Sequence, residues 1–388
     1  MDKITQILNR GVENIIVRED LEKRLRVGKK LRVYYGIDPT SPQLHLGHAV
    51  VLWKLRDFQE SGHEVILLIG DFTARIGDPT DRNAARQPLT KAEIKINMQD
   101  YKRQAGKILD FSKTKIQYND RWLSKLNFEN IIKLASNFTV QQMLDREMFQ
   151  ERIKQGKPIS LHEFLYPLMQ GYDSVAMNVD LEIGGNDQLF NMLAGRTLQK
   201  IYNKKDKYVL TTKLLPGLDN RKMSKSYGNI IGLADEPNNM FGKIMSMADE
   251  IMPDYFELAT RLSEEEIKEI LKQEPRETKA RLAREIVALY HGEKTSEKAE
   301  QEFERVFKEK KAPSKMPEIK LSTIACQLSD LLVKTRLASS RAEAKRLIKQ
   351  GAVKVDNKII KDPMREIKIK NNIILQKGRR GFVKIKVG

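Results

Sequence analysis

The sequence predicts an α/β fold in which a doubly wound parallel sheet is followed by helical and mixed segments. Two apolar runs, residues 31–37 (LRVYYGI) and 64–69 (EVILLI), have the length and composition of buried strands, and each is followed by Gly or Asp. Between them, residues 48–60 follow a helical pattern. A strand, a helix and a strand within about 40 residues form a parallel crossover unit, which is the building block of this fold class.

The same patterns locate the core and an interruption of the sheet. A further strand is expected at 179–183, where it ends at Gly184 and Gly185. Because the stretch at about 91–176 is mostly helical in pattern, we expect a long helical insertion before that strand. The 48–60 helix has an apolar face for the sheet, formed by Val51, Leu52, Leu55 and Phe58.

The sequence pattern of the second half of the chain changes at two points. From about residue 236 the pattern is helical and charge-rich, as in 262–273 and 279–292, and Gly292 is expected to end the second of these helices. A Lys-, Pro- and Ser-rich linker is expected at 308–320. Residues 321–388 begin with helical patterns and continue as alternating strands. Turns between those strands are expected at Asp356-Asn357 and Asn371-Asn372.

Length and composition exclude several classes of protein. A chain of 388 residues predicts two or three domains with a sizeable core. The single cysteine, Cys326, excludes a disulfide framework and a cysteine zinc site within the chain, and it fits a reducing cytoplasm. The longest aliphatic run, Val65 to Ile69, is far below the roughly 20 apolar residues of a membrane span. The N-terminus lacks the pattern of an export signal, so we expect no membrane partner.

Positive charge is concentrated near the C-terminus. The net charge is +18, and residues 321–388 contribute 17 Lys and Arg against 5 Asp and Glu, a net of +12. Such a density indicates a polyanion partner, and we favour RNA or DNA over an anionic membrane or a merely solvated surface.

A first motif lies between the predicted strand at 31–37 and the helix that follows it. His45 and His48 are three residues apart, so they share a face at the helix start, where free N–H groups and the helix dipole attract anions. Gly47 between them lets a ligand approach the backbone. This arrangement suits ATP phosphates. The alternatives are a metal site, which lacks a third ligand nearby, and ordinary helix capping.

A second motif, KMSKS, spans residues 222–226. Two lysines and two hydroxyls in a loop of turn-forming residues suit a polyphosphate, although a lysine-rich loop by itself is usually solvated surface.

A third pattern is a polar stripe on an otherwise apolar helix. Tyr166, Gln170 and Asp173 fall at i, i+4 and i+7, among Leu165, Leu168 and Met169. Side chains aligned in this way on a buried helix need polar partners. The spacing leaves two alternatives open, a bound ligand and an internal polar network.

Together these motifs resemble the class I aminoacyl-tRNA synthetases, whose two signatures are HxGH and KMSKS. Over essentially its whole length the chain is similar to the bacterial tyrosyl-tRNA synthetases, through YGIDPTSPQLHLGH (35–48), RIGDPTDR (75–82), the 166/170/173 stripe and GGNDQ (184–188). The C-terminal segment resembles the S4 RNA-binding module. The rivals are tryptophanyl-tRNA synthetase, a metabolite nucleotidyltransferase with HxGH, and a non-catalytic RNA-binding paralogue.

The resemblance implies four parts along the chain. These are a Rossmann-like catalytic domain at 1–230 with an insertion at about 118–165, a helical anticodon-side domain at 231–307, the linker at 308–320, and an S4-like domain at 321–388. It further implies a homodimer joined through the insertion, and a cytoplasmic location. No segment is left over for an editing domain.

The resemblance also implies an activity and its residues. L-tyrosine would be activated by ATP to tyrosyl-adenylate and passed to the 3′-terminal adenosine of tRNA(Tyr), with Mg²⁺ accompanying ATP and neither a tightly bound cofactor nor a resident metal. The catalytic residues would be Thr40, His45, His48, Arg82, Arg86, Lys222 and Lys225. The ATP site would comprise Gly36, Asp38, Gly47, Gly184, Asp187, Met223, Ser224 and Ser226. Tyrosine would be bound by Tyr34, Asp78, Tyr166, Gln170, Asp173 and Gln188.

The implied roles within the tyrosine site are specific. Tyr34 and Asp173 would bind the phenol hydroxyl, and Gln188 would lie near the carboxylate. The ammonium group would be held by Asp78, Tyr166 and Gln170. One departure is Glu182, where many bacterial relatives carry Gln. Two alternatives are open there: Glu182 alters the contacts to the ammonium group, or it points away from the site.

Overall fold

The computed structural model describes residues 2–80, 89–224, 227–309, 311–314, 316–323, 325–378 and 381–388. These residues form two compact units, 1–292 and 293–388, which are described separately below.

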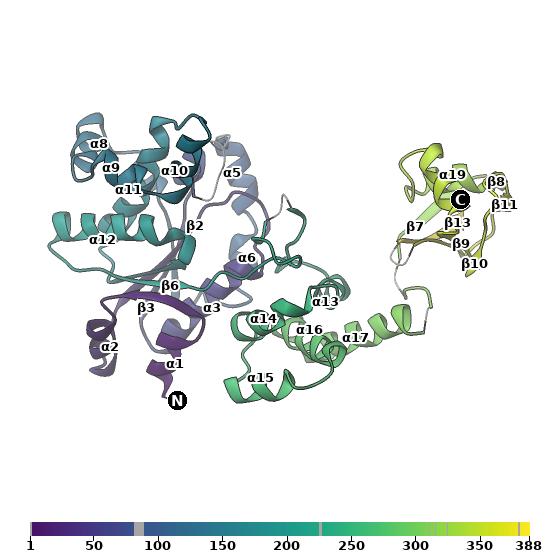
Figure 1. Cartoon of the computed structure of the whole chain (residues 1–388), viewed down its shortest axis with the longest axis horizontal. Helices are drawn as coiled ribbons and strands as arrows, with labels where there is room; N and C mark the ends of the chain where they lie inside the picture. Colours follow the sequence, from purple (N-terminus) through teal and green to yellow (C-terminus); the bar gives the residue numbers. More distant parts are fainter. Residues whose placement is uncertain are drawn as a thin grey trace. The chain divides into compact units, whose positions relative to one another are not determined.

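The first unit is built on a mixed sheet that is largely parallel (Figure 1). Among the described residues its strand order is β1-β6-β5-β2-β3-β4, and β1 alone runs antiparallel, along β6. The prediction of a doubly wound parallel sheet is therefore confirmed. The strands are β1 (Val12–Ile16), β2 (Arg32–Ile37), β3 (Glu64–Ile69), β4 (Thr114–Tyr118), β5 (Leu181–Gly185) and β6 (Tyr208–Thr212).

Three of these strands were not predicted. β4 lies inside the stretch at about 91–176 whose pattern is mostly helical, where no strand was predicted. β1 and β4 are the edge strands and are only partly buried, so they lack the apolar runs that reveal a central strand. β6 is buried along its whole length, but its sequence YVLTT is short and ends in two threonines.

Two helices form the crossovers that matter for the site. α3 (Leu46–Glu60) connects β2 to β3, and its predicted apolar face is buried. α12 (Leu189–Asn203) connects β5 to β6 and packs on α11 (Leu161–Met177). The pair approaches closely, because a Cβ added at Gly171 would lie 3.1 Å from the backbone nitrogen of Gly195.

The predicted insertion consists of short helices between β4 and α11. They are α7 (Asp120–Leu123), α8 (Phe128–Ala135), α9 (Val140–Leu144) and α10 (Glu147–Lys154). A buried ion pair joins α10 to α11, since the Arg152 guanidinium contacts both carboxylate oxygens of Glu163 at 2.6 and 2.9 Å. Glu163 also accepts a hydrogen bond from the backbone N–H of Ser160, which caps α11.

The helical region predicted at 231–307 belongs to the first unit as far as residue 292, whereas its last fifteen residues form α17 (Glu293–Phe307) in the second unit. The helix before this boundary, α16 (Pro275–His291), ends at Gly292 with φ +85°, a conformation that favours glycine, so this stop is as predicted. The remaining helices of this region are α13 (Pro237–Met245), α14 (Met252–Ala259) and α15 (Glu264–Ile270). Smaller helices elsewhere in the unit are α1 (Lys3–Asn9), α2 (Arg18–Arg26), α4 (Thr73–Ile76), α5 (Lys91–Met98) and α6 (Tyr101–Ala105).

The second unit contains a small α+β fold preceded by α17 (Glu293–Phe307). Its helices α18 (Leu328–Lys334) and α19 (Arg341–Lys349) pack on a sheet of order β10-β9-β12-β13-β7 through a shared apolar core. A separate two-stranded pair joins β11 to β8. The strands are β7 (Glu318–Leu321), β8 (Ala325–Gln327), β9 (Val353–Val355), β10 (Lys358–Ile359), β11 (Glu366–Lys368), β12 (Ile373–Lys377) and β13 (Gly381–Val387).

Turn chemistry in this unit follows the sequence, whereas the linker boundary does not. Asp356, Asn357 and Asn372 all have positive φ, as expected for Asx-rich turns. The turn at 356–357 joins the paired strands β9 and β10, whereas β11 before Asn372 pairs with β8 and β12 after it pairs with β9 and β13. The predicted linker at 308–320 is too long at its end, because Glu318 already pairs with Lys384 in a parallel ladder of β7 with β13. No helix within the described ranges is long and apolar enough to cross a membrane.

The buried ion pair generates a stability prediction. Replacing Arg152 by Met leaves the Glu163 carboxylate buried without its partner, which should cost roughly 3 kcal/mol in the free energy of unfolding, measured by urea denaturation. The control Lys133→Met breaks the exposed pair with Glu129 on α8 and should cost less than about 0.5 kcal/mol. Equal losses in the two variants would contradict this reading of the Arg152–Glu163 pair.

Candidate active site

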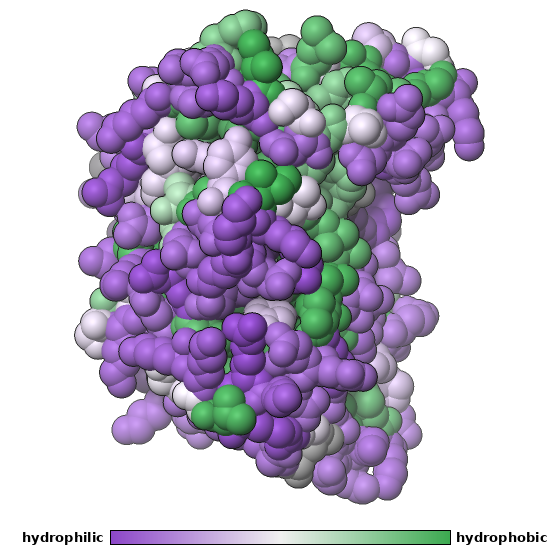
Figure 2. Space-filling model, turned by 90° about the vertical axis from the view of Figure 1, so that its left-hand side faces the viewer, coloured by the Kyte–Doolittle hydropathy of each residue, from purple (hydrophilic) through white to green (hydrophobic). Residues whose placement is uncertain are grey.

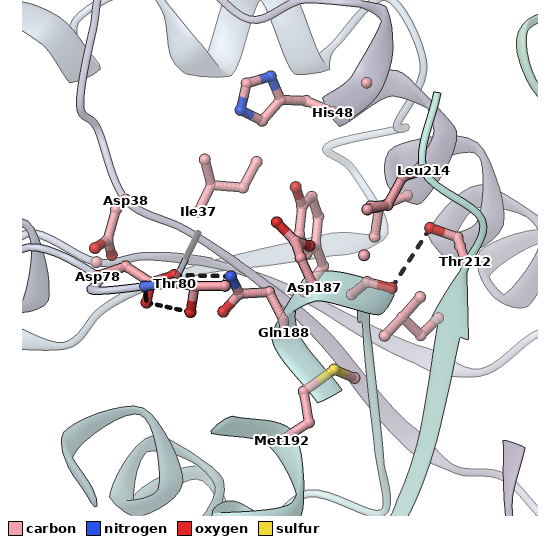
Figure 3. A pocket seen from close by; sticks show the side chains of 18 of the residues that line it. Ile37, Asp38, His48, Asp78, Thr80, Asp187, Gln188, Met192, Thr212 and Leu214 are labelled. Carbon is pink, nitrogen blue, oxygen red and sulfur yellow. Dashed lines mark hydrogen bonds between the residues drawn. The ribbon is translucent and has the colours of Figure 1, made fainter. Parts of the chain in front are cut away.

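A cavity of about 530 Å³ opens at the carboxyl ends of the central strands β2 and β5 (Figure 3). The residues after β2 and β5 line it, together with α11 and the segment after β6. Of the sequence-predicted site residues, the structure brings the following to this one cavity: Tyr34, Gly36, Asp38, Thr40, His45, Gly47, His48, Asp78, Tyr166, Gln170, Asp173, Gly184, Asp187, Gln188, Lys222 and Met223.

The other predicted residues lie elsewhere or outside the description. Ser224 is not among the residues that line the cavity, and its backbone N–H donates to the side chain of Asn229. Arg82, Arg86, Lys225 and Ser226 fall outside the described residues. The roles of all these residues remain predictions.

Asp173 is a buried carboxylate that lines the cavity. It is 2% exposed, and its two carboxylate oxygens accept hydrogen bonds from the Trp122 indole at 2.7 Å and the Asn119 amide at 3.1 Å. Burial raises the pKa of Asp173 well above its ordinary value, while the hydrogen bonds from Trp122 and Asn119 act in the opposite direction. The two donors therefore favour the ionised form of a carboxylate that faces the cavity.

Tyr34 lies beside Asp173, and its hydroxyl is held by residues that do not line the cavity. Its hydroxyl is 2.9 Å from the Ser174 hydroxyl, which in turn accepts a hydrogen bond from the Lys207 ammonium at 2.9 Å. Lys207 also forms a buried ion pair with Glu182. Burial raises the pKa of the Tyr34 phenol, so this side chain stays protonated and can donate.

The polar stripe of α11 is both hydrogen-bonded within the protein and open to the cavity. The Tyr166 hydroxyl donates to Asp38 at 2.9 Å, and the Gln170 amide donates to Glu182 at 3.1 Å. The internal polar network, one of the two alternatives left open by the spacing, is therefore present, and the bound-ligand alternative stays a prediction. These side chains have internal partners, and they also line a cavity that can hold a ligand.

Two further carboxylates have fixed orientations. The Thr73 hydroxyl donates to Asp38 at 2.7 Å, and it receives a hydrogen bond from Asn119 at 3.0 Å. Asp78 accepts hydrogen bonds from Gln188 at 2.7 Å and from the Thr80 hydroxyl at 2.6 Å (Figure 3). Each carboxylate is therefore positioned by the protein itself, before any ligand binds.

The N-terminus of α3 also lines the cavity, through His45, Gly47 and His48. His45 is the N-cap residue, its backbone N–H donates to Nδ1 of His48 at 3.2 Å, and the two rings are 4.0 Å apart. The helix-capping alternative is therefore confirmed, since His45 and His48 cap the start of α3. The same placement puts both imidazoles at the cavity wall, where the helix dipole favours an anion.

Two glycines leave the room that a ligand needs here. A Cβ at Gly36 would come no nearer than 3.7 Å to other protein atoms, so protein packing does not require glycine there, and the missing side chain enlarges the cavity. A Cβ at Gly47 would lie 3.1 Å from the His45 ring and 3.6 Å from the sulfur of Met223, so glycine brings these elements together. Nearby, Lys222 pairs with Asp187 at 3.3 Å.

No group of three His, Cys, Asp or Glu side chains in the part of the chain that the structure describes is arranged to hold a metal ion. His45 and His48 therefore have no third described side chain of these types with which to form such a group.

Sequence reasoning missed Asn119, which lines the cavity, and Trp122 and Lys207, which contact its lining residues from outside it. Asn119 and Trp122 follow β4, which was itself unpredicted, and Lys207 precedes β6 within a lysine-rich stretch. The rarity of tryptophan in this chain was the one signal for Trp122, since Trp53 is the only other.

With this geometry in view, comparison with known proteins identifies the class. Residues 26–308 match the family described as tRNA synthetases class I (W and Y), and residues 328–373 match the S4 domain. The chain belongs to this synthetase family and carries an S4 domain.

Relatives that match nearly the whole chain show to which members of this family it is similar. The chain is 48% identical to the tyrosine–tRNA ligase of Moorella thermoacetica, with 98% of this chain and 95% of the relative covered. It is 46% identical to the tyrosine–tRNA ligase of Thermotoga maritima, with 99% and 97% covered. A truncated mitochondrial tyrosyl-tRNA synthetase of Aspergillus nidulans has a TM-score of 0.67 at 25% identity, covering 79% of this chain and 94% of its own. The chain is thus a member of the tyrosine–tRNA ligases, and the tryptophan alternative is not favoured.

The Trp122 contact generates a pH prediction. Trp122→Phe removes a hydrogen bond to ionised Asp173, so the pKa of Asp173 should rise further. If the ionised carboxylate binds substrate, kcat/KM for tyrosine falls as pH drops through that pKa, and the acid limb should move to higher pH in the variant. The pH dependence of tyrosine-dependent pyrophosphate exchange measures this.

Trp53→Phe is the matched control, because the Trp53 indole donates to Tyr290, a residue that does not line the cavity. An acid limb at the same pH in the Trp122 and Trp53 variants would show that the indole does not tune Asp173.

Proposed function

We propose that this cavity is where the chain joins L-tyrosine to ATP, before the tyrosyl group passes to the 3′-terminal adenosine of tRNA(Tyr). The observation that carries the proposal is the continuity of the cavity. It leads from a buried carboxylate and phenol at Asp173 and Tyr34 to a helix N-terminus with two imidazoles at His45 and His48. A phenol-bearing amino acid and a polyphosphate would meet between these two ends.

At the amino-acid end, the substrate phenol lies between Tyr34 and Asp173. The Asp173 carboxylate accepts the substrate O–H, so phenylalanine would leave this buried group without its partner. The substrate ammonium lies among Asp78, Tyr166 and Gln170, near carboxylates already oriented by Thr80 and Thr73. Gln188 lies beside the substrate carboxylate, held by its hydrogen bond to Asp78.

At the nucleotide end, the phosphates lie against the start of α3. Thr40, His45 and His48 donate to them, and the free N–H groups of the helix add to the attraction. The adenosine packs where Gly36, Gly47 and Gly184 leave space, with Asp38 and Asp187 facing ATP and its ribose. Met223, Ser224 and Ser226 would complete the nucleotide contacts from the KMSKS segment.

The reaction itself needs no side-chain nucleophile. The tyrosine carboxylate attacks the α-phosphate in line, the bond to the β-phosphate breaks, and pyrophosphate leaves with its bonding electrons. Catalysis then consists of positioning and of charge stabilisation. Cationic side chains neutralise the pyrophosphate as it forms, namely Lys222, Lys225, Arg82 and Arg86. Mg²⁺ enters as part of the ATP substrate and supplies further charge neutralisation at the phosphates.

The second unit would bind the tRNA. The exposed side of α19 carries Arg341, Lys345, Arg346 and Lys349, within a segment of net charge +12. Contacts of this kind go to phosphates and position the RNA without reading its sequence. Because Cys326 in this unit is a free thiol, we place the protein in the reducing cytoplasm.

We also propose that the insertion pairs with a second copy of the chain. Phe128 and Leu161 are 78% and 82% exposed, whereas Leu134 on the same helix as Phe128 is buried. Figure 2 shows apolar side chains gathered on the upper part of the face that includes this region. Further exposed apolar residues here are Ile132, Val140 and Ile153. Such a cluster is typical of a subunit interface.

The decisive experiment is amino-acid-dependent exchange of labelled pyrophosphate into ATP with a panel of amino acids. Tyrosine alone should support exchange, and Asp173→Ala should reduce it at least about a hundredfold, since a charged hydrogen bond to the substrate is lost. Circular dichroism checks that the variant is folded. A response to tryptophan, or an Asp173→Ala enzyme with normal kinetics, would overturn the assignment.

Charge reversal on α19 tests the role of the second unit. Lys345→Glu with Arg346→Glu should raise the KM for tRNA roughly tenfold or more, and reduce the salt dependence of aminoacylation, because two phosphate contacts are lost. Pyrophosphate exchange should not change. The control pair Lys29→Glu and Lys30→Glu makes the same change of charge at exposed positions before β2. If both pairs weaken tRNA use alike, the effect is one of overall charge.

A further inference from the structure

A buried lysine lies directly behind the wall of the tyrosine end of the cavity. Lys207 immediately precedes β6 and is fully buried, although Lys204 and Asp206 beside it are exposed. Its ammonium pairs with Glu182 and donates to the Ser174 hydroxyl at 2.9 Å. Glu182 and Tyr34 line the cavity, whereas Lys207 and Ser174 do not.

The surrounding helices make room for this ammonium. A Cβ at Gly195 on α12 would lie 2.5 Å from Nζ of Lys207 and 2.8 Å from the Ser174 hydroxyl. Glycine at this position is therefore what allows the lysine tip to reach between α11 and α12. The charged groups around Nζ are Glu182, in direct contact, and Arg196 and Asp173 further away, and the Tyr34 ring lies 6.0 Å from it.

Stability alone does not account for such an arrangement. Burying an ion pair usually costs about as much desolvation energy as its attraction returns, and apolar replacements of equal volume are often neutral or stabilising. An ammonium group does fix which partner is the donor, since it can donate hydrogen bonds and never accept them.

The donation by Lys207 sets the direction of the next hydrogen bonds toward the cavity. Because Lys207 donates to Ser174, the single hydroxyl hydrogen of Ser174 is available either to Tyr34 at 2.9 Å or to Glu182 at 3.5 Å. The shorter contact is much the better hydrogen bond, and Glu182 already receives one from Lys207. With Ser174 donating to Tyr34, the hydrogen of the Tyr34 hydroxyl is available to another acceptor, which is Glu182 in the protein alone and the substrate oxygen when tyrosine is bound.

We propose that Lys207 is a positioning residue for amino-acid selection, because it orients a donor chain from Lys207 through Ser174 to Tyr34. The chain fixes Tyr34 as the donor to the substrate oxygen, while Asp173 is the acceptor of the substrate hydrogen. The site then requires a group that both accepts and donates, which a hydroxyl does and a hydrogen, fluorine or methoxy substituent does not. This inference rests on the proposed assignment of the cavity to tyrosine.

Two variants interrupt the hydrogen-bond relay from Lys207 through Ser174 to Tyr34 in different ways. Ser174→Ala removes the link and keeps both charges. Lys207→Met combined with Glu182→Gln removes both charges and keeps an acceptor for Gln170. In each, the KM for tyrosine in pyrophosphate exchange should rise roughly tenfold with a smaller change in kcat, and the preference for tyrosine over phenylalanine should fall roughly tenfold. Adding either change to Tyr34→Phe should cause little further loss, because both act through the Tyr34 hydroxyl.

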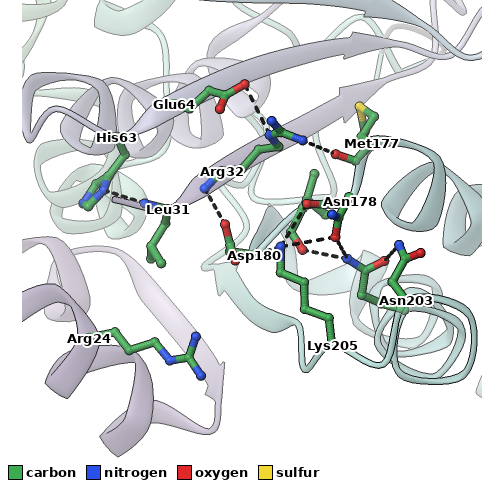
Figure 4. A network of polar contacts seen from close by, with 12 residues as sticks. Arg24, Leu31, Arg32, His63, Glu64, Met177, Asn178, Asp180, Asn203 and Lys205 are labelled. Atoms are coloured by element: carbon green, nitrogen blue, oxygen red, sulfur yellow. Dashed lines mark hydrogen bonds and ion pairs between the residues drawn. The ribbon is translucent and has the colours of Figure 1, made fainter. Parts of the chain in front are cut away.

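Lys205→Met is the matched control. Lys205 lies two residues away and pairs with Asp180 at 2.9 Å on a separate polar network (Figure 4), so its loss should leave the tyrosine preference unchanged. Thermal unfolding shows whether each variant is folded, and Ser174→Ala decides the question if the double variant is not. A tyrosine-to-phenylalanine ratio within twofold of the parent in folded Ser174→Ala would overturn the proposal. Absence of tyrosine-dependent exchange in the parent chain would instead overturn the proposed function.

Discussion

The pairing of β2 with both β3 and β5 is the constraint from which the site follows. The chain leaves β2 through α3 to reach β3 and leaves β5 through α12 to reach β6, so the two connections depart in opposite directions along the sheet. A crevice opens between them, as in other doubly wound sheets. The register sets Tyr34 opposite Glu182, which is why a phenol from one strand and a carboxylate from the next share one buried polar network.

That network shows how a site can be specific before its ligand arrives. Asp173, Asp38 and Asp78 each accept hydrogen bonds from neighbouring side chains, so their orientations are set by the protein. The cost of orienting them is met during folding, and binding need not pay it again. The same hydrogen bonds keep a cavity lined by carboxylates, of which Asp173 is buried, compatible with a stable fold, because each of the three has partners in the described structure.

The sequence predicted the parts of the site that depend on neighbouring residues, and it did not predict the parts that depend on contacts between residues far apart along the chain. The stripe of Tyr166, Gln170 and Asp173 and the pair of His45 and His48 were predictable, because helical periodicity and cap position are local properties. Trp122 and Lys207 were not, because they reach the site through tertiary packing of an edge strand and a lysine-rich loop. In sequence Lys207 resembles Lys204, and only the approach of α12 to α11 makes one buried and the other exposed.

Gly195 has a consequence for how this protein can vary over evolution. An alanine there would collide with the Lys207 ammonium, and a neutral side chain at Glu182 would remove the reason for burying that ammonium. Substitution at any one of the three positions is therefore costly while the other two remain as they are. The pair at 182 and 207 therefore forms a unit of sequence change, so a homologue that carries a neutral residue at 182 should differ at 207 as well. Position 195 should stay glycine even then, because a Cβ there would also lie 2.8 Å from the Ser174 hydroxyl.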